Sequence, residues 1–206
     1  MSVPAEVRTA RLVLRPWRAS DAAELEPILR VNQSHLGPWI PPTVSTPATQ
    51  RELAMRLAGF ADDFAADRSW RYAVFNAVDG ELLGELDLFS RDDATRVPLA
   101  NADRAEIGYW LRADRTGLGY ATEGAQAMID VASRIPAFTL IEIRCDTRNA
   151  RSAAVPARLG FHRSETRSDT NSADALEVWT LPLRPTGEAH GAVPREHRTS
   201  SNASHA

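Results

Sequence analysis

The chain has 206 residues, a formal net charge of −3 and one cysteine. This length favours one domain with a real core, and the charge gives no electrostatic reason to expect nucleic-acid binding. No apolar run reaches the roughly 20 residues that span a bilayer, the N-terminus lacks a secretory pattern, and one cysteine cannot form an internal disulfide, so we expect a cytoplasmic protein.

Apolar periodicity and turn residues predict a mixed α/β order. In chain order we expect a strand at 11–16, a helix from Ser20-Asp21 to about Leu29, an irregular stretch at 35–47, a helix at 49–67, strands at 70–77, 81–89 and 106–111, a helix after residue 119, a strand at 140–146, a short helix at 149–159 and a strand at 175–183.

Two polar stretches interrupt or follow these elements. Residues 91–104 are polar, contain a proline and are expected to form a long loop near the site. Residues 186–206 contain almost no large apolar side chain, so burial cannot offset the entropy of ordering them. We therefore expect one domain over 1–184 and a disordered tail over 185–206.

The stretch from Thr116 to Glu123 is the most informative part of the chain. Its glycines, Gly117 and Gly119, lie where a predicted strand passes into a predicted helix. The start of a helix offers unpaired backbone N–H groups and a positive dipole end, and glycine lets the backbone approach a bulky anion. The pattern predicts a phosphate-bearing ligand held mainly by backbone.

Two common phosphate loops fit this stretch poorly. A nucleoside-triphosphate loop needs Lys followed by Ser or Thr after its last glycine, whereas Tyr120 and Ala121 stand here. A dinucleotide loop needs a third Gly or Ala where Thr122 stands, and it usually opens its domain rather than lying past mid-chain. A dinucleotide oxidoreductase remains the weaker alternative.

The loop resembles motif A of the GNAT acetyltransferases, which binds the pyrophosphate of coenzyme A. Gly119 and Ala121 fall on the last two fixed positions of that motif, while Thr116 departs from its usual Gln or Arg. The stretch 149–161 resembles motif B in the form of the ribosomal-protein N-terminal (Rim-type) branch. Further similar stretches lie, in order, at 9–15, 20–22, 32–39, 83–84 and 176–181.

This resemblance implies a GNAT-like fold, a mixed sheet of six to seven strands flanked by helices. It also implies acetyl-CoA as cofactor and direct transfer of an acetyl group to a primary amine. The Rim-type likeness suggests the α-amine of a protein, with ribosomal proteins as one class of acceptor; a polyamine, an amino acid or an antibiotic amine stays open. A homodimer is also left open, and neither a membrane nor a metal is expected.

The resemblance also assigns the cofactor-binding positions. Backbone groups of Tyr109, Trp110 and Leu111 would follow the pantetheine arm, and Arg112 and Arg115 could reach phosphate or remain solvated charges. The pyrophosphate would bind the loop residues Gly117, Leu118, Gly119, Tyr120, Ala121 and Thr122. Asn149 and Ser152 would contact the arm, although both also suit an ordinary helix start.

Candidate acid–base groups follow from strand alternation and from the resemblance. Glu106 shares a strand face with Gly108 and Trp110, so it is the first candidate for the general base. Glu85 and Asp87 share a face of the neighbouring strand; they are rival candidates and could instead attract a cationic acceptor.

Ser152 is the candidate to assist the leaving thiol. Many members of the superfamily place a tyrosine acid four residues later, where this chain has Pro156. Proline has no proton to give, and it leaves the Ser152 carbonyl without its helical partner.

His35 and Trp39 lie in the segment expected to form a wall of the acceptor groove. The competing hypothesis is an acetyl-CoA sensor with little turnover. Its only support in the sequence is the two departures from the family motifs, at Thr116 and Pro156.

Overall fold

The computed structural model describes residues 3–168 and 175–183, so the predicted tail over 185–206 lies outside the described residues. The helices are α1 (Ala22–Leu36), α2 (Pro42–Ser45), α3 (Gln50–Ala65), α4 (Tyr120–Ala132) and α5 (Ala150–Arg158). The strands are β1 (Val7–Arg8), β2 (Leu12–Pro16), β3 (Trp70–Asn76), β4 (Leu82–Arg91), β5 (Arg104–Leu111), β6 (Leu140–Asp146), β7 (His162–Ser168) and β8 (Ala175–Pro182).

These strands form one mixed sheet in the order β1-β2-β3-β4-β5-β6-β8-β7. The sheet has eight strands, whereas the sequence predicts six to seven. β1 and β7 account for the difference: β1 is two residues long, and β7 is a polar strand that lacks the apolar alternation on which the prediction depends. The predicted α/β class is confirmed.

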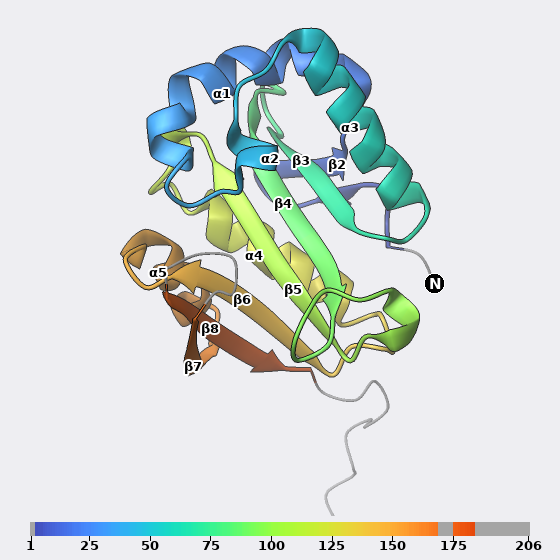
Figure 1. The fold of residues 1–206 in the computed structure, drawn as a ribbon, viewed down its shortest axis with the longest axis vertical. Coiled ribbons are helices and arrows are strands. Elements are labelled where there is room, and N and C mark those ends of the chain that lie inside the picture. The colour runs from blue at the N-terminus through green and yellow to red at the C-terminus, as the bar shows by residue number, and fades with distance from the viewer. Residues whose placement is uncertain (1–2, 169–174, 184–206) are drawn as a thin grey trace, which may run out of the picture.

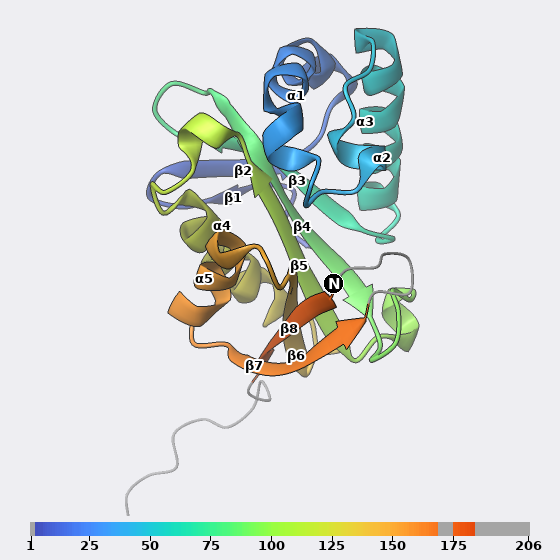
Figure 2. The same ribbon diagram turned by 60° about the vertical axis from the view of Figure 1, so that its left-hand side comes forward.

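Helices cover both faces of the sheet (Figures 1 and 2). On one face, α1 and α3 bury an apolar cluster that includes Leu29, Leu53 and Leu57. On the other face, α4 packs Ala125 and Met128 against the central strands. Figure 2 shows α5 beside α4 on this second face. The two faces therefore leave the strand ends as the place where a ligand can enter.

The first helix is longer than predicted. It ends at Leu36 rather than near Leu29, and a short helix, α2, lies inside the stretch expected to be irregular. The apolar stripe of α1 continues through Asn32 to Leu36, which are both buried, so packing favours helix beyond the predicted end. This extension carries the C-terminal half of α1 to the end of β5.

The sheet divides between its two parallel strands. β5 pairs with β6 only from Arg104 to Ile107, opposite 140–143, whereas it pairs with β4 along its whole length. β6 in turn pairs with β8 along its whole length. Beyond Ile107 and Ile143 the two strands therefore separate, each remaining in its own half of the sheet.

Gly84 allows β4 to lie close to β5. A Cβ atom at this position would lie 2.0 Å from the carbonyl oxygen of Trp110 and 2.9 Å from the Cα of Leu111. A β-bulge between β3 and β4 adjoins this position, because Val74 pairs with Gly84 and Phe75 pairs with Leu82. Glycine is therefore required here by close backbone approach.

We expect Gly84→Ala to lower the free energy of unfolding by about 3 kcal/mol, because backbone atoms of β5 must move to admit the methyl group. Gly59→Ala is the matched control: it lies inside α3 with nothing within 4 Å of the new atom. That control should raise stability by about 1 kcal/mol through helix propensity. Urea unfolding of both variants measures this difference, and equal stabilities would contradict it.

Candidate active site

A cleft of about 160 Å³ lies where β5 and β6 separate. Its walls come from both halves of the sheet, from the start of α5 and from the segment between α1 and α3. The lining residues are Trp39, Ile40, Pro41, Val44, Arg71, Glu85, Asp87, Phe89, Arg96, Ile107, Gly108, Tyr109, Trp110, Arg144, Cys145, Asp146, Asn149 and Ser152. Many of the predicted site residues therefore lie around one cavity.

The glycine loop follows the same end of β5. Gly117 and Gly119 have φ angles of 77° and 83°, in the left-handed region that favours glycine. Gly119 precedes α4, and the first N–H group bonded within that helix is that of Glu123, which donates to the Gly119 carbonyl. The amides of 120–122 precede it and point out of the helix start, where they suit an anion.

Arg11, which was not predicted as a site residue, holds this loop from the start of β2. Its guanidinium donates to the Leu118 carbonyl at 2.9 Å and lies over the ring of Tyr120, 4.7 Å from the centroid. It also pairs with Glu123 at 2.6 Å, and Glu123 accepts from the Thr9 hydroxyl. The contacts join residues more than 100 positions apart, so no local sequence pattern indicated them.

Arg112 and Arg115, two predicted phosphate ligands, are already paired. Both guanidinium groups bond to Glu81 in the turn before β4, at 2.7 Å and 2.8 Å. Arg112 also pairs with Asp114. These bonds fasten the connection after β5 to the β3–β4 turn. A phosphate contact from either arginine would have to compete with Glu81.

Asn149 and Ser152 both line the cleft at the start of α5. The Asn149 side chain accepts from the Ser152 N–H group at 3.1 Å, which makes Asn149 the helix cap that the sequence allowed. Ser152 also contacts the hydroxyl of Tyr109. Cys145 lies nearby in the lining, and burial raises its pKa to about 11, so it remains a neutral thiol.

The acidic residues of β4 differ sharply in their contacts. Glu85 is 1% exposed and accepts from Trp17 Nε1 at 2.6 Å and from Arg71 at 2.9 Å. Asp87 is also buried; its ion pair with Arg71 is longer, at 3.5 Å, and the Glu85 side chain lies within hydrogen-bond contact. Burial, reinforced by the charge of Glu85, raises the pKa of Asp87 well above its usual range.

Two buried polar atoms of the cleft lack partners. Among the described residues, the buried side-chain atoms without a hydrogen bond are Asp87 Oδ1, Ser90 Oγ and Trp110 Nε1. Asp87 and Trp110 are also among the residues that line the cleft, so one unpaired acceptor and one unpaired donor belong to its walls. Leaving such atoms unpaired is costly, and a ligand or water that pairs them would recover that cost.

Glu106 has the opposite surroundings to Asp87. It lies on the predicted strand face, but its carboxylate forms ion pairs with Arg91 and Arg96, and it is not part of the cleft lining. Burial opposes its ionisation, yet the charges and hydrogen bonds of the two arginines prevail and lower its pKa. This arrangement disfavours the predicted role as general base, because a base needs a free carboxylate.

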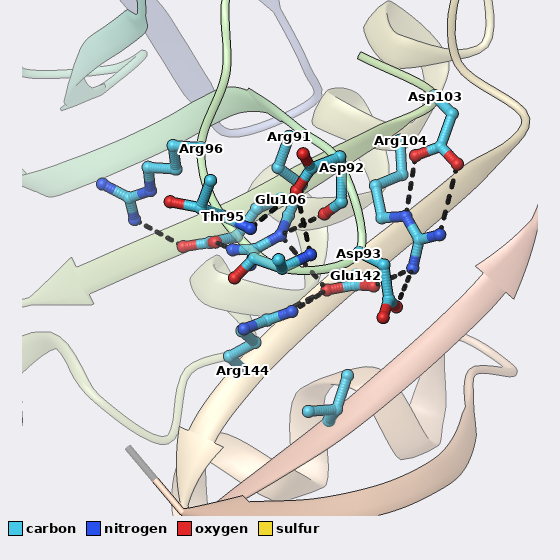
Figure 3. Close-up of polar contacts among 12 residues, drawn as sticks. Arg91, Asp92, Asp93, Thr95, Arg96, Asp103, Arg104, Glu106, Glu142 and Arg144 are labelled. Atoms are coloured by element: carbon cyan, nitrogen blue, oxygen red, sulfur yellow. Dashed lines mark hydrogen bonds and ion pairs between the residues drawn. The ribbon is translucent and has the colours of Figure 1, made fainter. Parts of the chain in front are cut away.

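Figure 3 shows that Glu106 belongs to a larger network of charges beneath the 92–103 segment. Glu142 of β6, 1% exposed, accepts from Arg104 at 2.9 Å and from Arg144 at 2.8 Å. Arg91 of β4 lies between the two carboxylates, 3.6 Å from Glu142. The network holds β4, β5 and β6 together where β5 and β6 are still paired, and two of its arginines, Arg96 and Arg144, also line the cleft.

His35 and Trp39 have separate positions. The His35 ring lies 3.2 Å from the Leu111 carbonyl, and nearby Asn32 accepts from the Ala113 N–H group at 2.7 Å. His35 therefore fastens α1 to the end of β5 and is not in the cleft lining. Trp39 does line the cleft and is 38% exposed.

Metal sites and membrane spans would indicate other kinds of function. Within 3–168 and 175–183, no group of three or more His, Cys, Asp or Glu side chains is arranged to hold a metal ion. The helices of that same part of the chain are all too short or too polar to cross a membrane.

Comparison with known proteins identifies the family. Residues 11–162 match the acetyltransferase (GNAT) domain, so the chain belongs to this family, as the motifs predicted. The chain is 28% identical over 160 residues to YdaF of Bacillus subtilis (strain 168), named as a ribosomal N-acetyltransferase; the match covers 73% of this chain and 77% of YdaF.

Solved structures share the fold. RimL, a ribosomal L7/L12 α-N-protein acetyltransferase solved with coenzyme A, matches with a TM-score of 0.72 and 20% identity over 89% of this chain and 98% of RimL. RimJ of Mycobacterium smegmatis, solved with a coenzyme A disulfide, matches with a TM-score of 0.66 and 25% identity over 91% of this chain and 88% of RimJ. The chain is thus an N-acetyltransferase of the GNAT family.

We expect Arg11→Gln to raise the KM for acetyl-CoA by roughly three- to tenfold, because the loop loses a charged support near the helix start. The same variant should leave kcat/KM for S-acetyl-pantetheine unchanged, since that donor lacks the nucleotide. Arg8→Gln is the control, because Arg8 is exposed and, within the described residues, forms an ion pair only with Glu6. Equal losses with both donors would mean a general structural role instead.

Proposed function

We propose that this chain transfers the acetyl group of acetyl-CoA directly to a primary amine bound in the cleft. The observation that carries the proposal is the separation of β5 from β6 beyond Ile107 and Ile143. It opens a passage between two strands, with a glycine loop at one end and unpaired polar atoms within. Bound acetyl-CoA would supply an activated acetyl thioester.

The residues present fit that cofactor. The amides of 117–122 would hold its pyrophosphate at the start of α4, with Arg11 supporting the loop. Beyond Ile107, the edge of β5 that faces β6 is released from pairing, so those backbone groups of 108–110 that do not bond to β4 are available to an extended arm. Asn149 and Ser152 border the same passage from α5.

We assign the acceptor end of the cleft to the side of β4. Asp87, Trp110 and Trp39 line it, and the first two bring the unpaired acceptor and donor described above. A carboxylate there can accept a proton from an ammonium group or orient an amine. A buried carboxylate with one unpaired oxygen and a raised pKa is a better candidate for this role than Glu85 or Glu106, whose carboxylates accept short hydrogen bonds.

The acceptor class that we favour is the α-amine of a protein N-terminus. Support comes from the names of YdaF and RimL, which refer to ribosomal proteins, and from a cleft open enough to leave Trp39 partly exposed. A peptide N-terminus carries its amine beside a carbonyl group, so it offers a donor to Asp87 and an acceptor to Trp110 Nε1. Free polyamines lack that carbonyl group.

Thiol release from acetyl-CoA tests this proposal. We expect release to depend on an added amine and to be fastest with short peptides that have a free N-terminus. N-terminally blocked peptides of the same sequence are the control and should give no release above background. Release with spermidine or an amino acid but not with peptides would reassign the acceptor, and tight binding of acetyl-CoA without transfer to any amine would refute the enzyme proposal.

Asp87→Asn should lower kcat/KM by about 10²- to 10⁴-fold, the range typical of losing a general base. In the wild type, kcat/KM should rise with pH through the raised pKa of Asp87 and then level off, because only the ionised carboxylate accepts a proton. The Asn variant should lose this limb of the pH–rate profile.

Glu106→Gln is the matched control for that prediction. It leaves Arg91 and Arg96 without their shared carboxylate, so thermal stability should fall, while kcat/KM below the unfolding temperature should stay within about threefold of the wild type. If Glu106→Gln removed the acidic limb of the profile and Asp87→Asn did not, Glu106 would be the base.

A further inference from the structure

Helix α5 contains a proline that removes one of its hydrogen-bond donors. In an α-helix the N–H group of each residue donates to the carbonyl four residues earlier, so position 156 should serve the Ser152 carbonyl. Pro156 has no N–H group, yet α5 continues through it to Arg158. The Ser152 carbonyl therefore needs a donor from outside the helix, since it belongs to a partly buried residue.

Tyr109 of β5 supplies that donor. Its hydroxyl group donates to the Ser152 carbonyl at 2.9 Å, and the same phenol oxygen lies 3.1 Å from Ser152 Oγ. Both residues line the cleft. A contact from β5 thus replaces the missing helical bond, and it does so across the opening between the two halves of the sheet.

The number of protons fixes the direction of the second contact. A phenol has one hydrogen, and in this geometry it is given to the Ser152 carbonyl, so the remaining lone pair can only accept. In that contact the Ser152 hydroxyl can therefore act only as the donor to Tyr109, and the Ser152 side chain also has a hydrogen-bond contact with Cys145. Because Asn149 also accepts from the Ser152 N–H group, Ser152 is held at its nitrogen, its carbonyl oxygen and its hydroxyl.

Burial raises the pKa of Tyr109, mainly by desolvation, with the hydrogen bond to Ser152 opposing it. The phenol therefore keeps its proton at neutral pH. Tyr109 remains a donor to the carbonyl and does not remove the proton of Ser152. The arrangement keeps a neutral, protonated serine hydroxyl at the cleft.

We propose that Tyr109 is a positioning residue, which replaces the N–H group lost at Pro156 and fixes the place of the Ser152 hydroxyl at the edge of the cleft. The inference rests on the proposed function, because it assumes that Ser152 acts on the bound thioester. It explains how a chain with proline at the position of the superfamily's tyrosine acid still presents a fixed hydroxyl group there.

A double-mutant cycle between Tyr109 and Pro156 tests this inference. Tyr109→Phe keeps the ring but removes the donor, and we expect kcat to fall roughly three- to tenfold with little change in KM for acetyl-CoA. Pro156→Ala restores an N–H group for the Ser152 carbonyl. In the Tyr109→Phe background it should restore kcat at least threefold, whereas in the wild type it should change kcat less than twofold.

Tyr72→Phe is the matched control. Its hydroxyl also donates to a backbone carbonyl, that of Pro4, at 2.8 Å, but it lies outside the cleft lining. This variant should lose stability without losing kcat. If Tyr109 itself delivered a proton, Pro156→Ala would give no rescue, and that result would overturn the positioning role, as would an unchanged kcat in Tyr109→Phe.

Thermal unfolding of the same four proteins gives a second readout that does not need turnover. The change in melting temperature caused by Pro156→Ala should be larger in the Tyr109→Phe background than in the wild type, because only there is the carbonyl unpaired. Additive changes would contradict the inference. If the wild type acetylated no amine, the proposed function would fail, while this cycle would still decide whether Tyr109 and Pro156 share one carbonyl.

Discussion

The separation of two parallel strands is the constraint on which the rest of this structure depends. β5 remains paired with β4, and β6 remains paired with β8. Beyond Ile107 and Ile143, β5 and β6 therefore form no backbone hydrogen bonds with each other. Backbone groups that would normally be paired inside a sheet are thereby exposed to a cleft. The close approach of β4 at Gly84 and the fastening of α1 by His35 both hold β5 on its own side of the gap.

Charge is distributed along the sheet so that the two ends differ. At the closed end, Glu106 and Glu142 are surrounded by arginines, and this network ties β4, β5 and β6 together (Figure 3). Nearer the opening, Asp87 is buried with one oxygen unpaired. Acidic side chains of the same sheet therefore differ in role: fully paired carboxylates hold strands together, whereas the one with an unpaired oxygen is the candidate to act on a substrate.

Local signals in the sequence were sufficient for much of the fold and for the glycine turn before α4. The strand at 140–146 and the glycine turn before α4 follow from short patterns of apolar residues and glycine. Strand alternation placed Glu106 on the same strand face as Gly108 and Trp110. It could not reveal the arginines that contact Glu106 from β4 and from the following loop. The contacts of Arg11 and of Tyr109 also join distant segments, which no local pattern encodes.

Hydrogen–deuterium exchange with and without coenzyme A tests the central claim most directly, because it reports on individual backbone amides. The account predicts slower exchange on binding at 117–122 and at 108–110, with little change in the closed end of the sheet at 104–107. Protection confined to other segments, or binding with no change at either stretch, would show that the opening between β5 and β6 is not the cofactor site.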